Sequence, residues 1–214
     1  MNTDDFDFCF KYILLGDSGA GKTSILTAFC ENEHMMNYNC TIGVDFKNMV
    51  IPIPKYNKKV KLHIWDTAGQ EKFLSIVKSY FREITVCIFV YDINNYQSFT
   101  NIKNWIEELD NHCNNLSLKV LVGNKIDLKK DQVMKNDIDK LAKKYDMINV
   151  FSSAKENINI QEIFIMSAEQ IIHNIQHNNI KDLSSHGIKQ VVKKKMSQFS
   201  MSDKKIQTKC CTIL

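Results

Sequence analysis

Several features typical of secreted and membrane proteins are missing from this sequence. No hydrophobic run approaches the roughly 20 residues that a membrane-spanning helix needs. The seven cysteines are odd in number and show neither paired spacing nor a zinc-binding pattern, which argues against a disulfide framework. The first residues are acidic where a signal or transit peptide is basic, and Asn2 stands where N-myristoylation requires glycine. We therefore expect a cytosolic protein whose core cysteines are reduced.

Arginine is almost absent too, since Arg82 is the only one, and the basic residues are unevenly distributed. The 214 residues are 44% hydrophobic and 24% charged, the balance of one compact domain with an appendage. Residues 176–214 carry eight lysines and two aspartates, a net charge of +6, whereas residues 1–175 hold 20 basic and 22 acidic side chains. The overall charge of +4 thus hides a basic tail, which points to a membrane surface and gives no reason to expect nucleic-acid binding.

Short runs of branched and aromatic residues alternate with helical patterns along the chain. This alternation predicts an α/β fold with a six-stranded, mostly parallel sheet, one antiparallel edge strand and helices on both faces. The expected strands are 8–15, 44–53, 59–65, 85–91, 119–122 and 148–151. The expected helices are 22–31, 74–81, 98–112, 135–145 and 160–175. Lys58 and Lys59 after Pro54 indicate a turn, so the second and third strands should form an antiparallel hairpin.

The apolar rhythm of the last expected helix ends at Ile175, and this sets the expected domain organisation. One folded domain over residues 8–175 should be flanked by a flexible N-terminus, 1–7, and by a flexible basic tail, 176–214. The sequence contains no internal repeats.

Residues 16–23, Gly-Asp-Ser-Gly-Ala-Gly-Lys-Thr, match the pattern G-x-x-x-x-G-K-[ST] between an expected strand and an expected helix. Glycines let such a loop wrap around phosphate, so that backbone N–H groups and the helix N-terminus point at the anion. Lys22 is expected to reach the β- and γ-phosphates, and the Thr23 hydroxyl to bind Mg²⁺. A chance glycine turn is the alternative, and the strand-loop-helix setting counts against it.

The base is expected to be read by Asn124-Lys-Ile-Asp127, which follows the fifth expected strand at the edge where open α/β sheets bind ligands. A carboxylate at Asp127 can accept hydrogen bonds from the ring N–H and the exocyclic amine of guanine. Adenine presents an acceptor there, which would leave a buried carboxylate facing a lone pair at a cost of several kcal/mol. A solvated turn is the alternative for this tetrapeptide alone. Ser153-Ala-Lys155, after the sixth expected strand, strengthens the prediction of guanine.

A third segment, Asp66-Thr-Ala-Gly-Gln70, ends the third expected strand, where it could sense the γ-phosphate. Asp66 can hold Mg²⁺ through water, the Gly69 N–H can approach the γ-phosphate, and Gln70 can orient an attacking water. Thr41 lies on the loop after the first helix, where its hydroxyl can bind the same metal. Because that contact would exist only with the triphosphate, it would order the loop before hydrolysis and release it afterwards. These residues predict a nucleotide-dependent switch.

Together these motifs resemble the small GTPases of the Ras superfamily, over roughly residues 8–175. Within the superfamily, the resemblance is to the Rab family. It is carried by Ile42-Gly-Val-Asp-Phe46, Lys61-Leu-His-Ile-Trp65, Asp66-Thr-Ala-Gly-Gln-Glu-Lys-Phe73, Tyr80-Phe-Arg82 and Val90-Tyr-Asp-Ile93. The resemblance implies a P-loop GTPase fold, the G domain, that cycles between GDP and GTP. It further implies slow, Mg²⁺-dependent GTP hydrolysis and the recruitment of effectors in vesicle traffic.

The resemblance also implies which residues form the sites. Those expected to bind the nucleotide are Ser18, Gly19, Ala20, Gly21, Lys22, Thr23, Ser24, His34, Thr41, Gly69, Asn124, Lys125, Asp127, Ser153, Ala154 and Lys155. Gln70 and Lys22 are assigned to catalysis; Thr23, Thr41 and Asp66 to the metal; Ile42, Phe46, Trp65 and Tyr80 to the effector surface. His34 stands where the family often has an aromatic residue, and Lys72 where it usually has arginine.

Hydrolysis should depend on a partner, because an arginine finger contributes about 10³ to 10⁵ in rate and Arg82 lies beyond the expected second switch. The intrinsic rate is then on the order of 10⁻⁴ to 10⁻³ per second, as for related GTPases. We expect an activating protein that supplies the arginine, together with an exchange factor and effector proteins, and a chain that is itself monomeric.

The two cysteines near the C-terminus, Cys210 and Cys211, indicate a lipid anchor. Cys211 fits the pattern C-a-a-X, with Leu214 favouring geranylgeranyl, and the tandem pair resembles Rab tails that carry a lipid on both cysteines. Two prenyl groups, or one with a basic segment, give stable anchoring. We therefore expect reversible attachment to the cytosolic face of an intracellular membrane, and a prenyl-binding escort protein.

Two other functions fit parts of the sequence. A P-loop enzyme for a small substrate, such as a nucleotide kinase, would share the phosphate loop but not Asp127, Gln70 or the prenylation pattern. A scaffold that stays bound to GTP would have an impaired Gly69 or Gln70, and both residues are intact.

Overall fold

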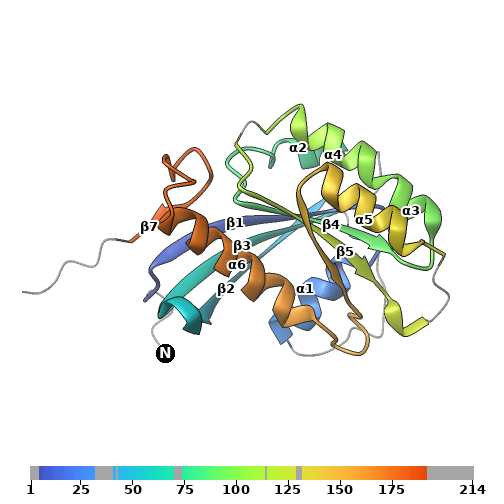
Figure 1. Ribbon diagram of the computed structural model, residues 1–214, viewed down its shortest axis with the longest axis horizontal. Helices are drawn as coiled ribbons and strands as arrows, with labels where there is room; N and C mark the ends of the chain where they lie inside the picture. Colours follow the sequence, from blue (N-terminus) through green and yellow to red (C-terminus); the bar gives the residue numbers. More distant parts are fainter. Residues whose placement is uncertain are drawn as a thin grey trace, which may run out of the picture.

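The computed structural model describes residues 5–31, 41, 43–69, 74–113, 115–128 and 132–191. The helices are α1 (Lys22–Glu31), α2 (Leu74–Lys78), α3 (Tyr96–Thr100), α4 (Ile102–Asp110), α5 (Lys135–Lys144) and α6 (Ile160–Gln176). The strands are β1 (Phe8–Leu15), β2 (Val44–Ile53), β3 (Lys58–Thr67), β4 (Val86–Asp92), β5 (Leu118–Asn124), β6 (Met147–Phe151) and β7 (Lys189–Gln190). Figure 1 shows their arrangement around a central sheet.

The strands form one sheet in the order β2-β3-β1-β4-β5-β6, with the short β7 added to β1. β3, β1, β4, β5 and β6 run parallel to one another. β2 is antiparallel to β3, in a register that runs from Val44 opposite Thr67 to Ile53 opposite Lys58. The predicted fold class is thus confirmed, including the hairpin at the edge of the sheet.

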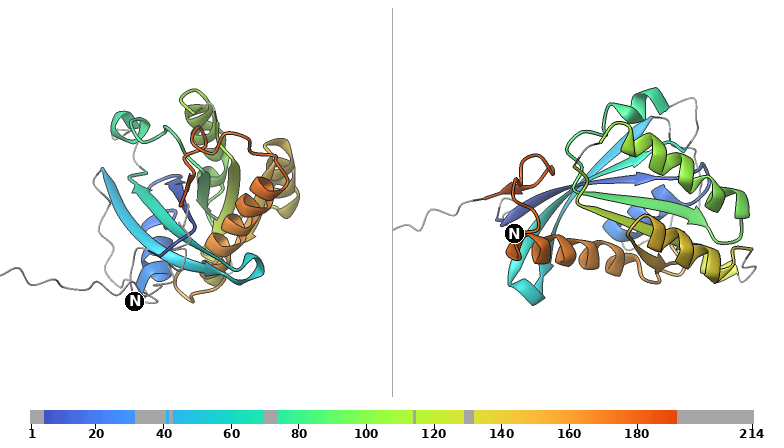
Figure 2. Two further views of the ribbon diagram at one scale, coloured as in Figure 1. Left: turned by 90° about the vertical axis from the view of Figure 1, so that its left-hand side faces the viewer. Right: turned by 45° about the horizontal axis from the view of Figure 1, so that its top comes forward.

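Helices cover both faces of the sheet, as Figure 2 shows. α1 and α6 pack on the face to which Tyr12 and Leu14 of β1 point. α2 to α5 pack on the opposite face, against Ile13 and Leu15. Successive side chains of a strand point to opposite faces, so a strand covered on both sides needs an unbroken hydrophobic run. This is why β1 and β4 stand out in the sequence.

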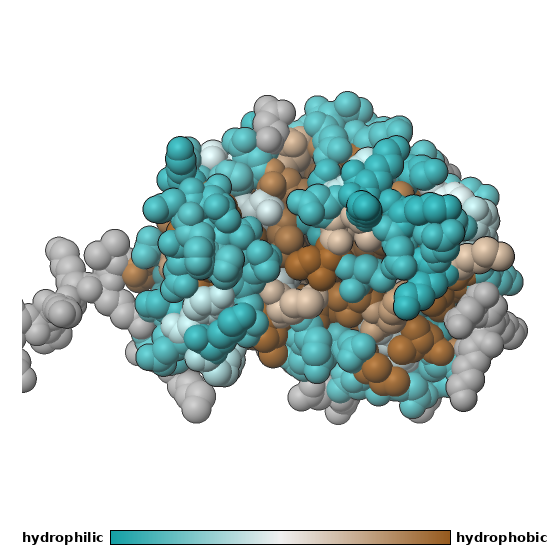
Figure 3. Space-filling view, in the orientation of Figure 1, coloured by the Kyte–Doolittle hydropathy of each residue, from teal (hydrophilic) through white to brown (hydrophobic). Residues whose placement is uncertain are grey.

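The predicted helix over 98–112 is two helices, and it begins earlier. The Asn95 side chain accepts hydrogen bonds from the backbone N–H groups of Gln97 and Ser98, and this cap starts α3 at Tyr96. Asn101 then separates α3 from α4. The outer surfaces of α4 and α5 are mainly hydrophilic, as Figure 3 shows, which leaves their apolar stripes for the core. The helix predicted over 74–81 ends at Lys78.

The folded body extends beyond both predicted limits. The Asp7 N–H donates to the Lys59 carbonyl at 2.8 Å, and the Asp7 carboxylate accepts from the Lys59 N–H at 2.9 Å. The flexible N-terminus predicted over 1–7 is therefore corrected for residues 5–7. Residues 177–191, which we call the C-terminal strap, turn back after α6 and end in β7, where Lys189 lies opposite Cys9 of β1. The flexible tail predicted from residue 176 is corrected for the strap.

The strap has a place to bind because β1 is longer on one side than its neighbour. Pairing between β1 and β4 begins only at Tyr12, which leaves the first residues of β1 with an open edge. β7 pairs with part of this edge, and the strap buries Ile180 and Ile188 against the body. Two isolated isoleucines among polar residues have no helical or strand period, so the sequence pattern did not indicate this element.

Two further observations bear on the sequence expectations. Among the helices of the described ranges, none combines the length and the apolar character needed to cross a bilayer. Among the described residues, Cys9, Cys87 and Cys113 are free thiols.

Candidate nucleotide-binding site

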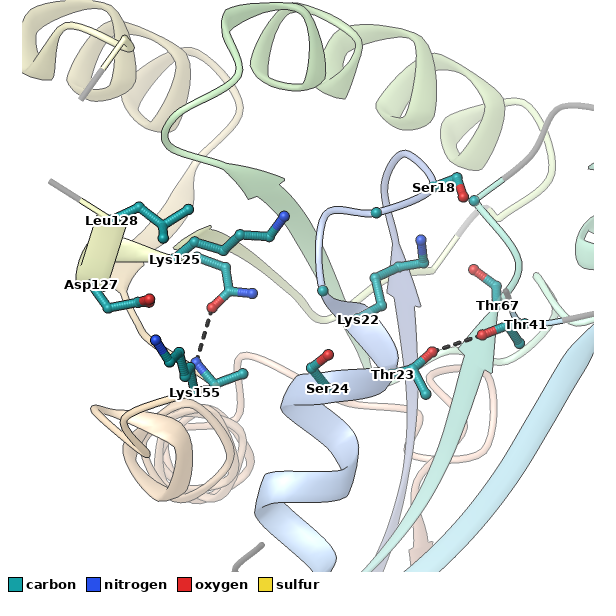
Figure 4. Close-up of a pocket in the computed structure, with 15 residues that line it drawn as sticks. Ser18, Lys22, Thr23, Ser24, Thr41, Thr67, Lys125, Asp127, Leu128 and Lys155 are labelled. Atoms are coloured by element: carbon teal, nitrogen blue, oxygen red, sulfur yellow. Dashed lines mark hydrogen bonds between the residues drawn. The ribbon is translucent and has the colours of Figure 1, made fainter. Parts of the chain in front are cut away.

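A cavity of about 480 Å³ opens at the carboxyl ends of β1, β3, β5 and β6, shown in Figure 4. Parallel strands bring their following loops to one edge of the sheet, so segments far apart in the sequence meet here. The cavity is lined by Ser18, Gly19, Gly21, Lys22, Thr23, Ser24, Thr41, Thr67, Gly69, Asn124, Lys125, Asp127, Leu128, Ala154 and Lys155.

The loop between β1 and α1 forms the floor of the cavity. Gly21 has a φ of +98°, and a side chain there would collide with the Asn124 amide, so the position requires glycine. Lys22 is the first residue of α1 and is buried. Its ammonium donates hydrogen bonds to the carbonyls of Gly16 at 2.7 Å and Asp17 at 3.0 Å. Burial lowers the pKa of Lys22 to about 8, although the nearby carboxylates of Asp66 and Asp17 oppose this. A bound phosphate would add negative charge and favour the ammonium form further.

The Asp17 side chain connects this loop to α4. Its carboxylate accepts a hydrogen bond from the Asn101 amide at 2.7 Å and another from the Trp105 indole N–H at 2.9 Å. The phosphate-binding loop is therefore held at its turn by α4 and by the residue before it.

Three oxygen-bearing side chains meet beside the phosphate loop. The Thr23 hydroxyl lies 2.7 Å from that of Thr41 and donates to Oδ2 of Asp66 at 2.5 Å. Asp66 is fully buried, and its Oδ1 has no hydrogen-bond partner among the described residues. Burial raises the pKa of Asp66 to about 6, despite the hydrogen bond from Thr23 and the charge of Lys22. Two hydroxyls and an unsatisfied carboxylate oxygen are hard ligands of the kind that Mg²⁺ prefers, so the donor set fits this ion.

Gly69 lies directly against the phosphate loop. Its carbonyl accepts a hydrogen bond from the Ser18 N–H at 2.9 Å, and any side chain at this position would collide with the backbone between Asp17 and Ser18. The segment after β3 and the phosphate loop are thus in contact, as a γ-phosphate sensor requires.

At the other end of the cavity, Asn124 connects the loops. It is buried; its amide donates to the Ala20 carbonyl at 3.0 Å and its Oδ1 accepts from the Ala154 N–H at 3.2 Å. The Asp127 carboxylate faces the cavity and accepts a hydrogen bond from the Ser153 hydroxyl at 2.6 Å. A carboxylate held in this way is oriented before a ligand arrives.

Lys125 reaches across the cavity from a strained backbone position, with φ of +68°. Its ammonium forms an ion pair of 2.8 Å with Asp92, at the end of β4. Burial alone would raise the pKa of Asp92, but the hydrogen bonds from Lys125 and Asn94 outweigh it and hold this pKa below its usual value. The pair links the ends of two neighbouring strands across the rim of the cavity.

Comparison with known proteins decides the family. A sequence model described as the Ras family matches residues 11–173. The chain is 40% identical to Ras-related protein Rab-8A of Rattus norvegicus over 203 residues, which cover 92% of this chain and 97% of the relative. The chain belongs to the Rab family of small GTPases. It is also 39% identical to GTP-binding protein YPT1 of Saccharomyces cerevisiae over 183 residues, 85% of this chain and 87% of the relative.

A third relative, GTP-binding protein YPTM1 of Zea mays, is 42% identical over 168 residues, 78% of this Rab chain and 80% of the relative. Ras-family small GTPases bind guanine nucleotides and hydrolyse GTP, and the Rab members act in membrane traffic. Effectors, activating proteins and exchange factors are the kinds of partner that membership of this family implies.

Most of the predicted site residues of this Rab protein meet in one place. Of those within the described ranges, Ala20, Ser153 and Asp66 are buried just behind the lining of the cavity. The remaining predicted nucleotide and metal residues within those ranges line it. His34, Gln70 and Ile42 lie outside the described residues, as do Cys210 and Cys211.

Sequence reasoning missed Asp17, Trp105, Asp92 and Leu128, and it missed the ion pair formed by Lys125, which it had assigned to the nucleotide. Asp17 and Trp105 are separated by 88 positions, and Lys125 and Asp92 by 33, so no local pattern announces either pair. Leu128 lines the cavity beside Asp127. Its place directly after Asp127 was the only available signal.

The three predicted effector residues that the structure describes form a cluster of aromatic rings on β2, β3 and the turn after α2. The ring centroids of Phe46 and Trp65 are 4.7 Å apart, and those of Trp65 and Tyr80 are 6.4 Å apart. Phe46 is 43% exposed, an unusual fraction for phenylalanine. We call Phe46, Trp65 and Tyr80 the aromatic cluster.

Proposed function

We propose that this Rab GTPase cycles between GDP- and GTP-bound states and recruits effectors to an intracellular membrane in vesicle traffic. The observation that carries the proposal is the single cavity that joins the phosphate loop, the oxygen ligands and Asp127. A nucleotide needs these three at once, for its phosphates, its metal and its base.

In the proposed mechanism, Lys22 exchanges the carbonyls of Gly16 and Asp17 for the β- and γ-phosphates. Mg²⁺, held by Thr23, Thr41 and Asp66, would neutralise charge on the phosphate oxygens. Asp127 would accept two hydrogen bonds from guanine. Gln70, assigned from its motif, would orient the attacking water. An activating protein would supply an arginine finger, because Arg82, the only arginine of the chain, lies beyond the expected second switch.

The switch in this proposal is the Thr41 loop. The Thr41 hydroxyl contacts the Thr23 hydroxyl. A metal bound by both would therefore connect the Thr41 loop to the phosphate loop. Loss of the γ-phosphate would release Thr41 and change the surface beside the aromatic cluster. The membrane anchor would be prenyl groups on Cys210 and Cys211, carried in the cytosol by an escort protein.

The first test is the identity of the bound nucleotide. The purified full chain is denatured and the supernatant is chromatographed, and GDP or GTP is expected. From the folded protein, release of the nucleotide should be faster after Mg²⁺ is removed with a chelator. Finding ATP, or no nucleotide together with no affinity for GTP, would overturn the proposal.

A matched pair of variants tests the base-reading residue. Asp127→Asn should weaken GDP binding about tenfold or more, because hydrogen bonds to a charged acceptor contribute about 1.5–3 kcal/mol each. Asp137→Asn, the same change at a partly exposed residue of α5 outside the cavity lining, should leave it unchanged. The measurement is isothermal titration of GDP and ADP into nucleotide-free protein.

A further inference from the structure

A second cavity, of about 400 Å³, lies between the C-terminal strap and strands β1 and β3. From the body its lining includes Lys11, His63, Trp65 and Glu83, and from the strap it includes Gly187 and Lys189. Within the described ranges, it shares no lining residue with the nucleotide cavity. Figure 2 shows the strap beside the start of β1, away from the carboxyl ends of the strands.

The strap wall of this cavity is held in place by specific contacts. The Thr85 hydroxyl donates to the His186 carbonyl at 3.0 Å and accepts from the Lys11 N–H at 3.0 Å. The His186 ring lies 2.7 Å from the Ser117 hydroxyl. Gly187, with φ of +66°, packs so closely on the Glu83 backbone that a side chain would collide with its carbonyl. The cavity is therefore a built feature of the fold.

The cavity is continuous with the aromatic cluster through Trp65. This ring belongs to the cluster on one side and lines the cavity on the other. His63, also a lining residue, has its ring centroid 5.5 Å from that of Phe46. A protein that covers the aromatic cluster would thus reach the mouth of the cavity without crossing intervening surface.

The charge inside the cavity is positive. The Lys11 ammonium lies 5.0 Å from the Trp65 ring centroid, and one of its three donors is paired with the Arg82 carbonyl. Lys189 enters from the strap, and Glu83 is the acidic residue of the lining. Burial, together with the charges of Lys61 and Lys189, lowers the pKa of His63 and so favours its neutral ring. An anionic group would be favoured here over a neutral or cationic one.

We infer that the strap and the β1–β3 strands together form an extension of the effector site, which receives an acidic side chain of the effector. The effector's apolar residues cover the aromatic cluster, and its aspartate or glutamate enters the cavity between Lys11 and Lys189. This inference rests on the proposed function, because it requires that effectors bind the aromatic cluster.

The test uses a displayed library of two-helix peptides, selected for binding to the full chain loaded with GTPγS. Selected peptides should carry an acidic residue at one position, and binding should weaken about tenfold in Lys11→Gln and in Lys189→Glu. Lys181→Glu is the matched control, an exposed strap lysine outside the cavity, and should change affinity less than about twofold. Changing the acidic residue of the peptide to lysine should restore binding to Lys189→Glu.

The outcomes separate the two proposals. Peptides that require Phe46 and GTPγS but bind all three lysine variants equally would overturn the inference and leave the proposed function standing. Peptides that bind the GDP form equally, or that tolerate Phe46→Ala, would count against the proposed function. Circular dichroism of each variant checks that the fold is retained, and Lys11→Gln keeps a donor for the Arg82 carbonyl.

Discussion

At the scale of single residues, the nucleotide cavity has two kinds of side chain: those that face it, and those that hold its loops together. Lys22, Thr23 and Asp127 face the cavity. The Asn124 amide forms hydrogen bonds with protein backbone through both its nitrogen and its oxygen. The two carboxylate oxygens of Asp17 accept hydrogen bonds from Trp105 of α4 and from Asn101, the residue before α4. Substitution of Asn124 or Asp17 would therefore change nucleotide affinity indirectly, by displacing the side chains that face the cavity.

Trp105→Phe tests this division. The indole N–H that supports Asp17 is lost while most of the apolar contact remains, so unfolding free energy should fall by about 1–3 kcal/mol. GDP should also dissociate faster, because Asp17 of the phosphate loop loses one of the two hydrogen bonds that hold its carboxylate. Urea unfolding and stopped-flow release of a fluorescent GDP analogue measure the two effects. Unchanged stability with unchanged release would show that the contact has no supporting role.

At the scale of elements, strand ends and short connections set the geometry. The carboxyl ends of β4 and β5 are joined by the Asp92–Lys125 ion pair, and the open edge of β1 is covered by β7. Neither contact lies within one helix or strand. Each therefore links elements whose separation would open one of the two cavities.

The ion pair predicts a pH dependence of stability. Because the folded-state pKa of Asp92 is lowered, its contribution is present above the unfolded pKa of about 4 and is lost as pH falls through the folded value. The difference in unfolding free energy between the wild type and Asp92→Asn should therefore shrink as pH falls from about 6 to about 3. Urea titrations across this range measure it, with Asp137→Asn as the reference. A difference that stays constant would contradict the assignment.

The strap predicts a different effect of two glycine substitutions. Gly187→Ala combines a left-handed φ with a collision against Glu83, whereas Gly43→Ala has a φ of +83° and open space around the new methyl group. Amide exchange over residues 183–191 should accelerate in Gly187→Ala alone, because only this change displaces the strap. Hydrogen-deuterium exchange with mass spectrometry measures it. Equal protection in both variants would mean that the strap tolerates the collision.

These contacts also explain which parts of the fold and of the site could be predicted from the sequence. The strands were predictable because burial on both faces leaves unbroken hydrophobic runs, as in β1 and β4. The cavity was predictable because its ligands follow strand ends in recognisable order. The strap was not, because Ile180 and Ile188 have no period, and neither was the support of Asp17 by Trp105, because 88 positions separate them.

At the scale of the whole molecule, the two proposed functions of the chain lie at opposite ends of the sheet. The nucleotide cavity is at the carboxyl ends of the strands, and the strap ends beside the first residues of β1. The Val191 N–H donates to the Asp7 carbonyl at 2.9 Å, so the strap leaves the body beside the N-terminal segment. The body thus presents different ends to its nucleotide and to the proposed membrane anchor.

The proposed anchor predicts the outcome of a cysteine pair substitution. A variant with both Cys210→Ser and Cys211→Ser should move from the membrane fraction to the cytosol, because each buried methylene of a prenyl group contributes about 0.8 kcal/mol. Cys113→Ser is the control, since that half-buried thiol lies in the body. Fluorescence imaging and fractionation of cells measure the distribution. Retention of the double variant on membranes would argue for another means of attachment.

The strap changes how far the body can stand from a membrane. With the proposed anchor, a chain tethered from the end of α6 would have 34 residues, from 177 through Cys210, an extended reach of about 115 Å. With the strap bound, the tether is counted from Val191, and the 19 residues from 192 through Cys210 span at most about 65 Å. Release of β7 would nearly double the radius that the tethered body can search, so a bound strap confines the GTPase to partners close to the bilayer.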